Sequence, residues 1–168
     1  MRTLGRLLLL PALAGLCAGI ALTAGLIDFS AAKQPGRLEE RFATFALNRS
    51  IARRAPKVAN PLARSPEAIA AGLALFRTHC VDCHGAPGVD PTEGGASLNP
   101  PAPGLTLARV QARSDGELQW IVSNGIRMTG MPSFGASRSE DEVWQLVAAL
   151  RRLPELSPEE RQRLAKER

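Results

Sequence analysis

The chain has 168 residues with 45% hydrophobic and 22% charged residues, a composition typical of a folded protein rather than a disordered one. Its net charge of +5 comes from the front, because residues 28–64 hold eight Lys/Arg against three Asp/Glu, whereas residues 65–168 hold eleven against thirteen. No aromatic-interleaved basic motif accompanies this charge, so composition does not indicate binding to nucleic acid.

The first segment is apolar. Residues 7–27 form a run of 21 residues without a charge, behind Arg2 and Arg6. A helix rises about 1.5 Å per residue, so this run would span roughly 31 Å, close to the ~30 Å hydrocarbon core of a bilayer. The apolar region of a cleaved signal peptide is shorter, about 7–15 residues. We therefore expect residues 1–6 to be a cytoplasmic N-terminus and residues 7–27 a transmembrane anchor, with a signal peptide as the alternative.

The next segment, residues 28–64, combines a helical pattern with a proline-rich stretch. Leu38, Phe42 and Phe45 follow one another at spacings of four and three, which places them on one face of a helix. The pattern predicts an amphipathic helix over residues 36–54. The prolines that follow predict an extended linker up to the domain that begins at residue 65.

Residues 65–168 are expected to be all-α. Ser65, Pro66 and Glu67 are a cap, a first-turn proline and a first-turn acid, which predicts a helix that runs to the first cysteine of this region. Glycine and proline are frequent in residues 85–114, so this stretch is expected to be mostly loop, with a short turn near Leu107. No segment alternates with the period of a strand. Further helices are expected after three serines that can cap them: Ser114, Ser139 and Ser157.

The motif that carries chemistry is C-x-x-C-H, formed by Cys80, Cys83 and His84. A zinc site would lack ligands, since only His79 remains beside the motif, and a thioredoxin-like redox pair would lack its βαβ surroundings. A haem attachment site is complete: two cysteines on one helical face can add to the two vinyl groups of a porphyrin, and the histidine can ligate the iron. The motif therefore predicts one covalent haem c, attached outside the cytoplasm.

The second axial ligand can be sought among few residues. The chain has two histidines, and His79 lies too close to His84 to reach the other side of a porphyrin. A thioether sulfur is the remaining good ligand for haem iron. Met128 and Met131 lie in a loop rich in glycine and proline, where packing in an apolar core is a weak explanation for two methionines. From the residues alone, either methionine is a candidate.

Residues 65–155 resemble the class I c-type cytochromes, in particular the membrane-anchored monohaem members of bacteria. The resemblance rests on "GLALFRTHCVDCHG", "PPAPGL", "NGIRMTGMPSFG" and "DEVWQLVAALRRLP". It implies a small helical domain around one haem, with His84 as the proximal ligand. The methionine before proline, Met131, is implied as the distal ligand, with Met128 as the runner-up. It also implies that a proline carbonyl, of Pro101 or Pro103, accepts a hydrogen bond from His84.

The resemblance implies further contacts around the haem. Its first and last helices cross, with Gly72 and Phe76 facing Trp144 and Val147. Three more residues are expected in the surroundings of the haem: Trp120 against its edge, Arg127 near a propionate, and Met128 against the ring.

These expectations combine into one function. We expect an electron carrier, not an enzyme, with no small-molecule substrate. Held at the bacterial inner membrane through residues 7–27 with its haem domain in the periplasm, it would pass single electrons between periplasmic or membrane redox proteins. These partners would dock at the exposed haem edge. The alternatives are a haem-bearing subunit of a respiratory oxidase or dehydrogenase complex and, in another class, a haem-based gas sensor.

Overall fold

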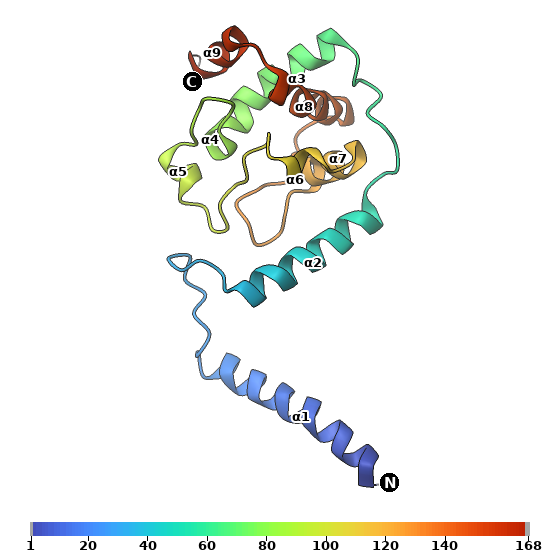
Figure 1. Ribbon diagram of the computed structural model, residues 1–168, viewed down its shortest axis with the longest axis vertical. Helices are drawn as coiled ribbons and strands as arrows, with labels where there is room; N and C mark the ends of the chain where they lie inside the picture. Colours follow the sequence, from blue (N-terminus) through green and yellow to red (C-terminus); the bar gives the residue numbers. More distant parts are fainter. Residues whose placement is uncertain (1, 167–168) are drawn as a thin grey trace. The chain divides into compact units, whose positions relative to one another are not determined.

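The computed structural model describes the backbone of residues 2–166 and the side chains of residues 9–164. The chain divides into two compact units, residues 1–33 and residues 34–168. The first unit consists of helix α1 (Arg2–Thr23) and the turns that follow it (Figure 1). The second unit contains all the remaining helices.

Helix α1 differs from the expected membrane span over residues 7–27. It ends at Thr23, and Gly25 just beyond has a left-handed φ of +68°, a conformation that commonly terminates a helix. Among the described residues, no helix is both long enough and apolar enough to cross a bilayer. The expected transmembrane helix is therefore not confirmed.

The regular structure of the second unit is helical, because its described part contains no strand and only one isolated bridge, between Ala86 and Val89. The expectation of an all-α domain is confirmed. Its helices, in chain order, are α2 (Arg37–Arg54), α3 (Pro66–His79), α4 (Val81–His84), α5 (Glu93–Ala96), α6 (Ala108–Gln111), α7 (Asp115–Asn124), α8 (Glu140–Arg152), the 3₁₀ helix η1 (Leu153–Glu155) and α9 (Pro158–Lys166).

Helix starts follow the capping residues seen in the sequence. The side chains of Ser65, Ser114 and Ser139 each accept a hydrogen bond from a backbone N–H of the helix that follows. The short helix α6 begins directly after Leu107, as expected from the turn predicted there. Helix α5 interrupts the predicted loop and was not expected.

The centre of the unit is the crossing of α3 and α8, which lie against each other in Figure 1. A Cβ atom at Gly72 would collide with the carbonyl group of Gln145, so only glycine allows the two backbones to approach this closely. The crossing expected from the resemblance is thus present, but its contacts differ. Gly72 faces Gln145 and Ala149 rather than Trp144 and Val147.

Helix α8 is buried on more than one side, which explains this difference. Phe76 of α3 packs with Val143, Leu146 and Leu150 in the main core cluster. Trp144 and Val147 lie in a second cluster, with Val110 and with Leu118 of α7. Helix α8 therefore packs between α3 and α7, with one apolar face against each of them.

Helix α2 and the linker after it belong to the same unit as the domain that begins at residue 65. Ile51 is fully buried, and α2 packs against α7. The amide of Asn60, buried in the linker, donates a hydrogen bond to the carbonyl of Trp144 at 2.9 Å, and its backbone N–H donates to Asp115 at 3.0 Å. The linker is therefore attached to the domain at its far end rather than extended freely, and the structure divides near residue 33.

Candidate haem site

The C-x-x-C-H motif lies where α3 meets α4. Cys80 is the residue between the two helices, and Cys83 and His84 are the last residues of α4. Both cysteines are half-buried and neither forms a disulfide. Burial raises the pKa of the Cys80 thiol to about 12, and the nearby Cys83 adds to this effect. The cysteines are thus presented together at the edge of the core, as attachment to one group requires.

His84 is oriented by a residue from a distant loop. Its Nδ1 lies 2.8 Å from the carbonyl oxygen of Pro103, to which it donates a hydrogen bond. Of the two prolines considered, it is therefore Pro103 that makes this contact, and Pro101 is exposed. Burial lowers the pKa of His84, while the hydrogen bond to Pro103 acts in the opposite direction. The neutral ring then presents the lone pair of Nε2, the atom available to a metal.

The loop after α4 is pinned to the motif at two points. Both the backbone N–H and the hydroxyl of Thr92 donate to the carbonyl of Asp82, at 2.9 and 3.0 Å. Gly95 of α5 is buried against α4, where a Cβ atom would collide with the Asp82 carbonyl and the Cα of Cys83. Helix α5 therefore braces the helix that carries Cys83 and His84.

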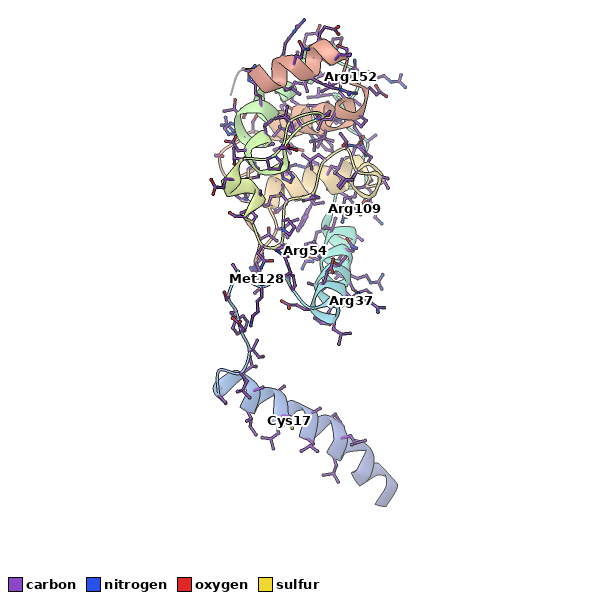
Figure 2. All side chains as sticks on the ribbon, turned by 60° about the vertical axis from the view of Figure 1, so that its left-hand side comes forward. Cys17, Arg37, Arg54, Arg109, Met128 and Arg152 are labelled. Carbon is purple, nitrogen blue, oxygen red and sulfur yellow. The ribbon has the colours of Figure 1, made fainter. Side chains whose placement is uncertain are left out.

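The two methionines of the loop after α7 have different environments. Met131 is half-buried and packs against the main core cluster, as do Cys80 and Leu105. Met128 is 84% exposed, has a left-handed φ of +61°, and lies at the rim of the unit in Figure 2. A side chain this exposed gives no support to the expected packing of Met128 against a haem.

Backbone hydrogen bonds hold the segment around Met131 against the end of α7. The N–H of Ile126 donates to the Met131 carbonyl at 3.2 Å. The hydroxyl of Thr129 donates to the Ile126 carbonyl at 2.7 Å and accepts from the Met131 N–H at 3.1 Å. Gly125 has φ +65°, and a Cβ there would lie 2.6 Å from the Met131 carbonyl. The loop can fold this tightly only with glycine at that position.

Two other residues expected near the haem, Trp120 and Arg127, differ in their burial. Trp120 is half-buried on α7, and Arg127 is exposed next to Met128. The structure therefore brings Cys80 and Met131 to one cluster and joins His84 to Pro103, but it gives no partner that would single out Arg127 among the exposed arginines.

Three contacts at the site were not foreseen. Arg138 donates to Nε2 of His79 at 2.8 Å and also pairs with Glu142, which ties the residue before Cys80 to the start of α8. Gly130 lies against the Leu98 side chain, where a Cβ atom would be 2.6 Å from a methyl carbon, and so brings the two long loops together. The third is the pair of hydrogen bonds that the Thr129 hydroxyl makes with the backbone of its own loop. The only signal for it in the sequence is the general tendency of threonine to bond to nearby backbone groups.

The set of donors fits a covalently bound haem. Within the described part of the chain, no three His, Cys, Asp or Glu side chains gather as a metal site of their own. What the chain offers instead is two unpaired thiols three residues apart, an imidazole with its Nδ1 engaged, and a half-buried thioether. Cys80 and Cys83 would hold a porphyrin through thioether bonds, and His84 and Met131 would ligate its iron.

Comparison with known proteins agrees with this set. Residues 67–148 match the family described as cytochrome c oxidase, cbb3-type, subunit III. These residues are a c-type cytochrome domain. Its cofactor is haem c with iron, covalently attached. In the chain this domain covers the helices from α3 to most of α8, together with the loops that carry Pro103 and Met131.

Two individual proteins are similar to this cytochrome. A protein of Thauera butanivorans named 1-butanol dehydrogenase (cytochrome c) is 33% identical over 84 residues, which cover 50% of this chain and 11% of that protein. The chain thus matches about a tenth of that relative's length. The crystal structure of cytochrome CL from Methylophaga aminisulfidivorans is 21% identical, with a TM-score of 0.42, and the match covers 81% of this chain and 85% of that one.

Proposed function

We propose that this cytochrome accepts and donates single electrons through one haem c, with His84 and Met131 as its axial ligands and with redox proteins as its partners. The observation that carries the proposal is the hydrogen bond from His84 Nδ1 to the Pro103 carbonyl at 2.8 Å. It leaves Nε2 as the ligand atom beside two cysteines that are free for attachment. When bound, the haem supplies a one-electron couple.

The residues of the chain then hold this group and limit its chemistry. Ligands from both sides leave no open position for a substrate, so the domain acts as a carrier rather than as an enzyme. Met131 is supported as the distal ligand by its burial against the cluster that Cys80 also contacts, and by the hydrogen bonds of Thr129. Redox proteins would dock briefly over the exposed edge of the group, as transient electron-transfer partners do.

We place this domain outside the cytoplasm, on the periplasmic side of the inner membrane, because haem is attached to C-x-x-C-H motifs there in bacteria. Anchoring through residues 7–27 remains a prediction. Apolar side chains of this segment are exposed, among them Leu10 and Leu16. Separation of the cell envelope into periplasmic and membrane fractions checks both statements. Recovery of the mature chain, free of the segment, in the periplasmic fraction would contradict the anchor.

The axial ligands are tested with two methionine variants. In ferric Met131→Ala we expect the sulfur-to-iron charge-transfer band to be lost, whereas Met128→Ala should keep it, because that side chain is exposed. An alkaline pyridine spectrum of both variants checks that two thioether bonds to the haem are retained. If the band is lost only in Met128→Ala, the ligand is Met128 and not Met131.

The ligand set also separates the carrier from a gas sensor. Carbon monoxide should bind slowly to the reduced parent protein at neutral pH, since Met131 occupies the position it needs, and quickly to Met131→Ala. Rapid binding to the parent protein would support a sensor instead.

A second candidate is a haem-bearing subunit of a larger oxidase or dehydrogenase complex. It is favoured by the relative whose name joins a dehydrogenase to cytochrome c and of which the chain matches only 11%. Purification in a mild detergent distinguishes the two functions. A stoichiometric partner supports the subunit, and a chain that purifies alone and exchanges electrons with small redox proteins supports the carrier.

A further inference from the structure

Helix α2 carries apolar side chains that the domain does not cover. Leu38, Phe42 and Phe45 are 82%, 74% and 62% exposed. They share one face of the helix, and we refer to them as the apolar row. Arg37 and Arg54 mark the two ends of α2 in Figure 2. Three large apolar side chains exposed together on one helix indicate a surface that binds something, whereas single exposed apolar residues need no explanation.

The apolar row does not face the domain. The contacts of α2 with the domain include Ile51, which is fully buried, and Asn48, which accepts a hydrogen bond from Arg113 at 2.8 Å. At about 100° per residue, Asn48 lies roughly 90° and Ile51 roughly 150° around the helix axis from the centre of the row. The helix therefore has one side for its own domain and another side for a different contact.

The charges around the apolar row indicate what that contact is. Arg49 lies on the row, with its guanidinium 5.9 Å from the centre of the Phe45 ring, and Arg41 and Arg53 lie within about 70° on either side. The two acids of the helix, Glu39 and Glu40, are about 90° or more away. Ile51 on the opposite side and Arg49 on the row leave α2 without a strongly segregated apolar face, so the three exposed apolar side chains and the three arginines beside them carry the argument. Apolar side chains next to arginines suit a surface that offers both acyl chains and negative charge.

We propose that α2 lies on an anionic lipid surface, with the apolar row inserted among the acyl chains and its arginines at the lipid phosphates. Each basic residue near such a surface strengthens binding by about fivefold. A second copy of the chain is a poorer occupant, since a symmetric contact would place Arg41 and Arg49 of both copies against each other. The inference does not depend on the haem or on its ligands.

Hydrogen exchange of the full chain tests this placement. Sedimentation with vesicles does not isolate α2, because the exposed apolar side chains of α1 would also bind lipid. The backbone amides of residues 37–47 should therefore be followed in vesicles of phosphatidylcholine alone and of phosphatidylcholine with phosphatidylglycerol. We expect exchange there to slow about tenfold when phosphatidylglycerol is present, and the effect to shrink at about 0.5 M salt.

Paired variants identify the residues responsible. The double variant Phe42→Ser with Phe45→Ser should abolish the slowing, and Arg41→Gln with Arg49→Gln should reduce it strongly. All four side chains are exposed, so the fold should be retained. The matched control, Leu107→Ser with Arg109→Gln, makes the same kind of change at exposed positions near α6 and should behave as the parent chain.

Three results would overturn the proposal. One is equal exchange in the two kinds of vesicle, and another is slowing that persists in the Phe42→Ser, Phe45→Ser variant. The third is protection of residues 37–47 that appears without lipid, either as the protein concentration rises or when a purified redox partner is added. That result would assign the apolar row to a second copy or to a partner protein.

Discussion

The segment that carries His84 and the segment that carries Met131 are held in place by different means. His84 is the last residue of α4, the short helix that follows α3. Pro103 accepts its hydrogen bond, and α5 packs against the helix that carries it. Met131 lies in no helix, and apart from packing against the core cluster it is held by hydrogen bonds within its own loop and to the end of α7. Segments with few buried contacts and local hydrogen bonds open first, so we expect the Met131 side to loosen before the His84 side.

The largest effect is expected from Gly95→Val, which disturbs the packing of α5 against the segment that carries His84. A side chain at this buried position must displace the Asp82 carbonyl or the Cα of Cys83, both backbone atoms. We expect a loss of about 3 kcal/mol in the free energy of unfolding and a lower yield of attached haem. Gly94→Val is the matched control, because a Cβ there meets only the Thr92 hydroxyl at 3.9 Å. Denaturant unfolding and the alkaline pyridine spectrum measure the two quantities, and equal behaviour of the variants would refute the bracing role of α5.

Gly125→Ala tests how the Met131 side depends on glycine. The added Cβ would lie 2.6 Å from the Met131 carbonyl, in a backbone conformation (φ +65°, ψ −170°) that essentially only glycine adopts, which costs about 2 kcal/mol. Gly88→Ala controls for a positive φ without a collision, since Gly88 has φ +81° with no atom within 4 Å of a Cβ. The control should lose about 1 kcal/mol and keep the charge-transfer band of the ferric protein, whereas Gly125→Ala should weaken that band. An intact band in Gly125→Ala would show that the loop does not need this tight turn.

The smallest effect is expected from Thr129→Val, which removes the two hydrogen bonds that hold the Met131 loop to itself. Global stability should fall by about 1 kcal/mol. The charge-transfer band should disappear on heating at a lower temperature than the loss of helical circular dichroism, and this gap should be wider than in the parent protein. Thr78→Val removes the hydrogen bond from an exposed hydroxyl to the Ala74 carbonyl on α3, and it should leave the gap unchanged. Coincident losses in Thr129→Val would mean that the two sides open together.

The difference between the two sides also explains what the sequence could predict. Cys80, Cys83 and His84 stand within five residues, so helical geometry alone brings them together, and the capping serines predicted the helix starts correctly. The choice between Pro101 and Pro103 depends on the path of a long loop, which no local pattern determines. The neighbours of Trp144 were assigned to the wrong helix because α8 is buried on two faces, and a periodic pattern does not say which face meets which helix.

Asn60 has a consequence for where this protein can be shortened. A chain that begins at Ser65 would keep every residue of the family match, which starts at residue 67. It would nevertheless lack the buried Ile51 and the Asn60 amide that donates a hydrogen bond to the Trp144 carbonyl. The unit that folds is therefore longer than the segment that matches the family. Exported behind a cleavable signal peptide so that haem can be attached, a chain that begins at residue 34 should accumulate as a stable protein, and one that begins at residue 65 should be prone to proteolysis.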